Sequence, residues 1–265
     1  MPSFHDFARG LRQLGIERDS PVIAHASLSA FGQMTGGAET LVGALLASFN
    51  AVIMPAFTYL TMLTPESGPP GNGLIYGAGK DTNRMAEFYT PDLPADRTIG
   101  AVSEALRRHP KAVRSMHPIL SFTGVNAASI LQAQTLSQPL EPIHALADAG
   151  GWVLLLGVDH TSNTSIHYAE RLAGRKQFVR WALTPDGIVA CPGWPGCSDG
   201  FQALAPRLEP VRRSVQVSSS LIQAFPLTAL VEAVTQTIAE DPFALLCHRP
   251  DCGRCNAVRE TPFTV

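Results

Sequence analysis

A histidine and a glutamate in the second half of the chain have the spacing of an acid–base pair. His167 and Glu170 are three residues apart, so in a helix they lie on the same face. They follow an aliphatic run at 153–158, which predicts a buried strand ending at Gly157, and a polar stretch at 159–165 that could cap a helix. Open α/β enzymes place their chemistry at the carboxyl ends of strands. This segment therefore predicts an enzyme with an oriented acid–base pair.

Two further histidines lie beside strand-like segments. His25 follows the apolar residues 21–24, at what would be the carboxyl end of a strand. A structural role is the simpler alternative for such a lone histidine. His117 precedes Pro118, and the neighbouring Arg114 and Ser115 could contact an anion. Neither histidine establishes a function alone.

The pattern around these residues is that of an α/β protein. Apolar residues at helical spacing predict helices at 3–14, 35–49, 97–109 and 226–240, with Thr35 as the cap of the second. Strand-like segments lie at 21–25, 51–55, 119–123, 153–158 and 211–217, and a turn at 184–187 predicts a hairpin. This order predicts a single-domain α/β/α sandwich over residues 1–265, with a central, mostly parallel or mixed sheet. Residues 61–80, rich in Pro and Gly, predict an inserted loop, either a binding loop or a surface excursion.

Composition excludes several classes of protein. The formal net charge of −2 argues against a nucleic-acid partner, which usually requires a basic stripe. No apolar run approaches the roughly 18 residues that span a bilayer. The first residues have charges in a helical pattern, unlike a signal peptide, so we expect a cytoplasmic protein with reduced cysteines.

Known nucleotide and nucleophile motifs are also missing. The chain has no P-loop, and the glycines at 71–77 neither follow a clear strand nor open a helix. There is no Gly-x-Ser-x-Gly elbow, which weakens a serine-hydrolase interpretation. The sequence therefore favours chemistry without a covalent enzyme intermediate.

The five cysteines form two groups in the sequence, Cys191 with Cys197, and Cys247 with Cys252 and Cys255. The spacing of Cys252 and Cys255 is that of a zinc knuckle, and His248 is nearby. The five-residue spacer between Cys191 and Cys197 is not a common knuckle turn. Reduced, packed thiols are therefore favoured over a structural zinc, and no metal ligand is assigned.

A series of short motifs resembles one known family, the aminoglycoside N(3)-acetyltransferases. In chain order they are His25-x-Ser27-Leu28, Thr35-Gly36-Gly37, Met54-Pro55-x-Phe57-Thr58, Gly100-x-x-x-Glu104, Arg114-Ser115-x-His117-Pro118-x-x-Ser121-Phe122, Leu155-Leu156-Gly157-Val158 and Asn163-Thr164-Ser165-x-His167-x-x-Glu170. Each is weak alone, but their order and spacing together are specific. The resemblance covers residues 23 to about 170.

The resemblance implies a fold unrelated to GNAT acetyltransferases and a specific reaction. Acetyl would pass directly from acetyl-CoA to the 3-amino group of a 2-deoxystreptamine aminoglycoside, which confers antibiotic resistance. His167 matches the catalytic histidine and Glu170 its acidic partner, and His25 could face the thioester oxygen. The residues that match segments lining the CoA channel are Ser27, Leu28, Ser115 and His117.

Three alternatives stay open from the sequence. The same family chemistry could act on a different amine, Asp159, His160 and His167 could hold a hydrolytic metal, or the cysteines could form a zinc-binding interaction module. A polycationic substrate requires acceptors, and the candidates are Asp92, Asp96, Asp159, Asp199 and Glu170. A homodimer is left open as well.

Overall fold

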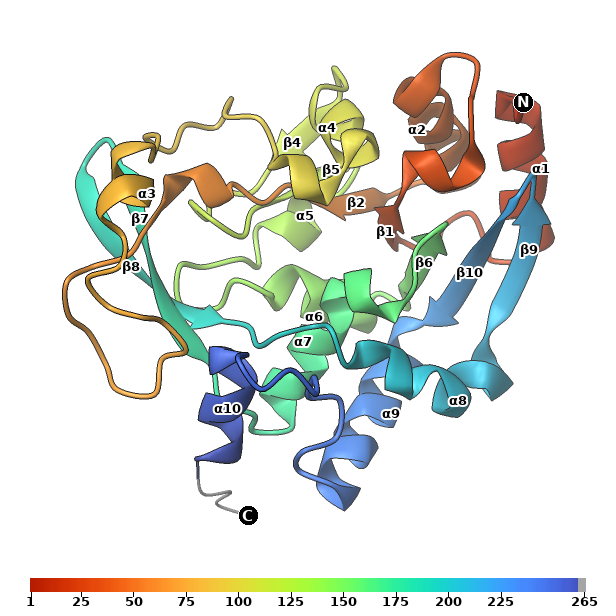
Figure 1. Ribbon diagram of the computed structural model, residues 1–265. Helices are drawn as coiled ribbons and strands as arrows, with labels where there is room; N and C mark the ends of the chain where they lie inside the picture. Colours follow the sequence, from red (N-terminus) through yellow and green to blue (C-terminus); the bar gives the residue numbers. More distant parts are fainter. Residues whose placement is uncertain (262–265) are drawn as a thin grey trace.

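A mixed seven-stranded sheet runs through the centre of the protein, in the order β4-β5-β2-β1-β6-β10-β9 (Figure 1). The computed structural model describes residues 1–261. The middle strands β2 (Val52–Pro55), β1 (Val22–Ala26) and β6 (Trp152–Leu156) are parallel. The outer strands are antiparallel to their neighbours: β4 (Ala112–Arg114), β5 (Phe122–Val125), β9 (Arg213–Val217) and β10 (Ser220–Pro226). The predicted mixed central sheet is confirmed.

Helices cover both faces of this sheet (Figure 1). One face packs against α1 (Phe4–Gln13), α2 (Gly37–Ser48) and α4 (Ala101–Arg107), and the other against α6 (Glu141–Asp148), α7 (Thr164–Leu172) and α9 (Leu227–Glu240). Successive residues of β1 alternate between the two cores, with Ile23 in one and Val22 and Ala24 in the other. Strands buried on both faces have continuous apolar runs, as the sequence has here. The predicted α/β/α sandwich is confirmed.

A smaller sheet lies beside the sandwich and holds the loop at 61–80. It consists of β3 (Met62–Leu63), β7 (Phe178–Thr184) and β8 (Gly187–Trp194), and the last two form the predicted hairpin. Asn72 ties the loop to β7, because its Nδ2 donates to the Val179 carbonyl at 3.0 Å and its Oδ1 accepts from the Val179 N–H at 2.9 Å. The loop therefore packs on the small sheet, beside α3 (Lys80–Arg84).

Several local predictions need correction. The N-cap of α2 is Gly36, at φ 75°, and the Thr35 side chain does not cap the helix. The helix predicted at 97–109 is broken at Gly100, where φ is 99°, into a 3-10 turn and α4. The strand predicted at 119–123 is β5, displaced toward the carboxyl end. Strand β10 and helix α6 were not predicted.

The remaining short helices are α5 (Ala128–Leu131), α8 (Ala205–Leu208) and α10 (Gly253–Arg259). Within residues 1–261, no helix combines the length and the apolarity needed to cross a membrane.

Gly157 allows β6 to turn toward α7. Its φ is 68°, and a Cβ there would lie 2.6 Å from the Ala30 Cβ. Gly150 has a similar φ of 70°, but a Cβ there would meet nothing within 4 Å. We expect Gly150→Ala to lose roughly 1 kcal/mol from the left-handed backbone alone. Gly157→Ala should lose at least about 1 kcal/mol more through the clash. Urea unfolding measures both, and equal losses would contradict this account of the turn.

Candidate active site

A cavity of about 890 Å³ opens at the carboxyl ends of the parallel strands. His25 and Ser27 reach it from the end of β1, Pro55 from the end of β2, and Val158 from the segment after β6. Parallel strands end at the same edge of a sheet, so side chains distant in sequence meet there. The start of α7 contributes Asn163, Thr164 and His167 to the same wall. The structure therefore brings the two predicted catalytic segments together.

Helix α7 presents His167 because its first turn is fixed by a cap. The Asn163 Oδ1 accepts a hydrogen bond from the Ser165 N–H at 3.1 Å, within the polar stretch expected to supply such a cap. His167 lies one helical turn further on and is largely buried, with its ring edge-on to Phe201 at a centroid distance of 4.7 Å. Capping and ring packing restrict the orientation of the imidazole.

Glu170 links His167 to a buried arginine. The His167 Nδ1 lies 2.8 Å from the Glu170 Oε2, and Arg175 Nη1 donates to the Glu170 Oε1 at 2.6 Å. Glu170 is 1% exposed and Arg175 3%. A carboxylate that accepts from Nδ1–H selects the tautomer with an unprotonated Nε2. Within residues 1–261, Nε2 makes no hydrogen bond, so it is available to a ligand in the cavity.

The turn that ends α7 brings Arg175 back into contact with Glu170. Gly174 has φ 75°, its N–H donates to the Arg171 carbonyl, and the Arg175 N–H donates to the Glu170 carbonyl, both at 3.0 Å. These two bonds form a Schellman motif, which reverses the chain after a helix. Arg175 Nη2 also donates to the carbonyls of Pro242 and Ala244, at 2.9 and 2.8 Å. Arg175 is thus fixed from both sides.

His25 lines the cavity as a neutral imidazole. Burial lowers the pKa of His25 to about 3. Its Nε2 is buried and has no hydrogen-bond partner among the described residues. A neutral ring of this kind can donate one N–H to a ligand oxygen.

The residues predicted to contact CoA divide into two pairs. Ser27 and Leu28 line the cavity, in the turn that follows β1. Ser115 and His117 do not line it. Ser115 Oγ accepts from the Phe122 N–H at 2.8 Å, and His117 Nδ1 accepts from the N–H groups of Ile119 and Leu120, at 3.1 and 2.9 Å. This second pair stabilises the turn before β5.

Arg114 likewise has a structural environment. Its Nη2 donates to the Ala56 carbonyl at 2.6 Å and its Nη1 to the Pro91 carbonyl at 3.0 Å. The Arg114 guanidinium already donates to these backbone carbonyls, so an anion could bind it only by replacing them.

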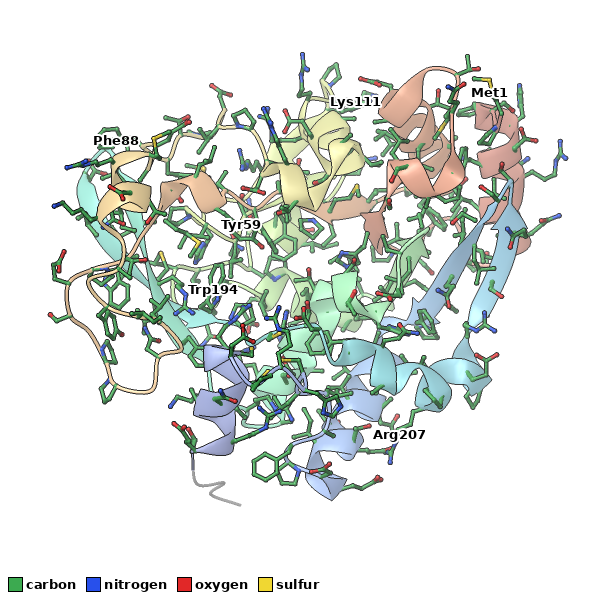
Figure 2. The ribbon with its side chains drawn as sticks, in the orientation of Figure 1. Met1, Tyr59, Phe88, Lys111, Trp194 and Arg207 are labelled. Carbon is green, nitrogen blue, oxygen red and sulfur yellow. The ribbon has the colours of Figure 1, made fainter. Side chains whose placement is uncertain are left out.

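The sequence did not reveal three cavity residues, Tyr59, Trp194 and Arg254. The rings of Tyr59 and of Trp194, the last residue of β8, are edge-on to each other at a centroid distance of 5.9 Å; Figure 2 labels both residues. Burial raises the pKa of Tyr59 to about 12, nearby Asp96 adds to the rise, and Arg254 opposes it. The sequence singled out none of the three, although Arg254 lies between Cys252 and Cys255.

The candidate acceptors for a polycation lie outside the cavity lining. Asp96 and Asp159 cap 3-10 turns, Asp199 pairs with Arg249 at 3.3 Å, and Glu170 is engaged behind His167. Asp92 is exposed. Apart from Glu170, which is bonded to His167, Asp96 is the candidate whose charge acts on a lining residue, Tyr59.

Asp159 and His160 do not combine with His167 as metal ligands. The Asp159 Oδ1 accepts from the Thr161 N–H at 2.9 Å. His160 is buried against Phe225 at a ring distance of 4.9 Å, and burial lowers the pKa of His160 to about 4. Within residues 1–261, the one group of three or more side chains that could hold a metal is formed by cysteines.

The grouping of the cysteines differs from the one predicted. Cys197 lies with Cys247, Cys252 and Cys255, and Cys191 is buried elsewhere. The hairpin β7–β8 holds Cys191, whereas the chain has left that sheet before Cys197. His248 is exposed and is not part of the cluster.

Comparison with known proteins identifies the family. A family model described as "Aminoglycoside 3-N-acetyltransferase" matches residues 23–239. Aminoglycoside N(3)-acetyltransferase VII of Streptomyces paromomycinus is 36% identical over 184 residues, which are 65% of this chain and 62% of that relative. The chain belongs to the aminoglycoside 3-N-acetyltransferase family, as the ordered motifs indicated.

Solved structures confirm the fold. The apoenzyme of aminoglycoside acetyltransferase AAC(3)-IVa matches with a TM-score of 0.77 at 23% identity, covering 97% of this chain and 96% of that one. The binary complex of AAC-IIIb with CoASH matches with a TM-score of 0.73 at 20% identity, covering 90% and 96%.

Breaking the Arg175–Glu170 pair should destabilise the protein, because the Glu170 carboxylate would remain buried without its charged partner. Arg175→Ala would leave the carboxylate with one partner, and we expect a loss of about 3–5 kcal/mol of unfolding free energy. Arg212 pairs with Glu209 at 2.6 Å on the surface, so Arg212→Ala should lose far less. Chemical denaturation compares the two variants. Similar losses for both would show that the buried pair does not stabilise the site as described.

Proposed function

We propose that this protein transfers the acetyl group of acetyl-CoA to the 3-amino group of a 2-deoxystreptamine aminoglycoside, in one direct step. The proposal rests mainly on the position of His167. Its side chain lies in the cavity wall, its Nδ1 is hydrogen bonded to Glu170, and its Nε2 has no partner. Family membership supports the reaction class, and AAC-IIIb, which has the same fold, binds CoASH.

His167 acts on the amine. An ammonium group has no lone pair, so the amine attacks in its neutral form, after one proton has passed to water. The nitrogen loses a second proton as it becomes an amide nitrogen; His167 Nε2 accepts that proton, and Glu170 stabilises the imidazolium that forms. The nitrogen adds to the thioester carbon, the C–N bond forms and the carbonyl oxygen gains negative charge. When the C–S bond breaks, the sulfur leaves as thiolate and can recover the proton from His167.

The other cavity residues suit the acyl donor. The neutral His25 can donate to the oxygen that becomes negative, which is the usual requirement of an oxyanion site. Ser27 and Leu28 follow His25 along the cavity wall and are the proposed CoA contacts. Ser115 and His117 are left out of this site, because their polar atoms serve the turn before β5.

A second candidate function has one observation in its favour. The cavity lining holds Arg254 and, among the described residues, no carboxylate. A polycationic aminoglycoside usually needs acidic acceptors, so a less basic amine is the alternative substrate for the same acyl transfer. Asp96, close to Tyr59, is the proposed acceptor if the substrate is an aminoglycoside.

The proposal includes a cytoplasmic location. All five cysteines are free and buried, which suits a reducing compartment. A homodimer stays a prediction.

His167→Ala should lower kcat by roughly 10²–10⁴-fold, because the general base is removed. Release of free thiol from acetyl-CoA, across a panel of aminoglycosides and simpler amines, measures this. His5→Ala, an exposed residue on α1, is the matched control and should keep the wild-type rate. A folded His167→Ala protein with near-normal turnover would reject the assignment. Turnover of simple amines but of no aminoglycoside would favour the second candidate.

A further inference from the structure

Four cysteines from distant parts of the chain meet at one point outside the catalytic pair. The sulfurs of Cys197, Cys247, Cys252 and Cys255 all lie within 4.8 Å of one another. All four side chains are buried. Cys197 lies in the segment after β8, and the other three lie between residue 247 and the first turn of α10, so the cluster joins these two segments.

The arrangement has the donor set of a structural zinc site. Zinc sites of this type use four thiolates, and Zn–S bonds of about 2.3 Å in a tetrahedron place the sulfurs about 3.8 Å apart. The cluster needs only a small contraction to reach that size. Four residues separate Cys247 from Cys252 and two separate Cys252 from Cys255, which are common ligand spacings. A closed set of four protein ligands leaves no open position for catalysis.

The charges near the cluster suit a metal–thiolate group. Zn²⁺ with four thiolates has a net charge of −2, and three arginines lie around it. Arg249 lies beside the Cys252 and Cys247 thiols. Arg259 Nη2 donates to the Cys247 carbonyl at 2.5 Å, and Arg254 lies between two of the ligands in the sequence.

We propose that Cys197, Cys247, Cys252 and Cys255 bind one zinc ion, which holds the outer wall of the active-site cavity in place. Arg254 Nη1 donates to the Gly196 carbonyl at 2.7 Å, and both residues line the cavity. Each of them is next to a proposed ligand in the chain. The zinc thus fixes the segment from Trp194 to Ser198 against the start of α10.

Binding requires the four thiols to lose their protons. Each thiol that becomes a ligand releases one proton, so up to four are released per zinc, and affinity falls as the pH falls. No electron transfer is involved.

The first measurement is the metal content of the untagged full-length protein, by plasma mass spectrometry after gel filtration. We expect about one zinc per chain. Cobalt substituted for zinc should give the visible absorption of a tetrahedral cobalt–thiolate site. A mercurial thiol reagent should release the zinc, as a chromogenic chelator would report.

Cys252→Ser and Cys191→Ser are the matched variants. Both replace a buried cysteine, but Cys191 is outside the cluster. We expect Cys252→Ser to retain less than a tenth of the zinc after dialysis against chelator, and to melt more than roughly 5 °C lower. Cys191→Ser should keep about one zinc. Limited proteolysis should become faster at 194–199 and 241–252 when zinc is removed from the wild type.

Three results would overturn the proposal. One is wild-type protein without zinc and with five reactive thiols after unfolding, which means packed thiols. Another is an intact mass lower than that of the fully reduced chain by four hydrogens, which would mean that the four cysteines form two disulfides. The third is equal zinc loss from both variants. The metal measurements need no substrate. A negative result for zinc would therefore not reject the proposed acetyl transfer, and the absence of acetyl transfer would not reject zinc binding.

Discussion

The buried carboxylate of Glu170 is the interaction on which the site depends. A carboxylate that is 1% exposed loses its hydration, and that loss is tolerated only with charged or donating partners. Arg175 supplies the charge and His167 the N–H, one on each carboxylate oxygen. The same contacts that make the burial tolerable also fix the tautomer and orientation of His167. Stability and proton transfer are therefore coupled through one side chain.

The topology of the sheet determines what His167 faces. Strands β1 and β6 are parallel neighbours, so the segments that follow them open at the same edge. One supplies His25, Ser27 and Leu28, and the other leads through Gly157 and the Asn163 cap to α7. The opposite wall comes from the small sheet and the C-terminal segment, through Trp194 and Arg254. The sandwich positions the proton-handling pair, and the added segments shape the space in front of it.

Local patterns predicted the parts of the site that lie within one element. His167 and Glu170 follow from helical spacing, and His25 from its place after a strand. Arg175 was missed because it lies beyond the end of α7 and returns to Glu170 only through the left-handed turn at Gly174. The pairing of Cys197 with the three C-terminal cysteines depends on packing between segments about fifty residues apart, which spacing does not encode. Ser115 and His117 matched a motif, but the contacts within their turn were not visible in the sequence.

Glu170 is expected to act on catalysis through His167. A double-mutant cycle with Glu170→Gln, His167→Ala and the double variant tests it, with kcat measured by thiol release from acetyl-CoA. If the carboxylate works only by orienting and stabilising the imidazole, Glu170→Gln slows the wild type but has almost no effect once His167 is absent. The double variant should then match His167→Ala. Two effects that multiply in the double variant would contradict the account, because each residue would then act on its own.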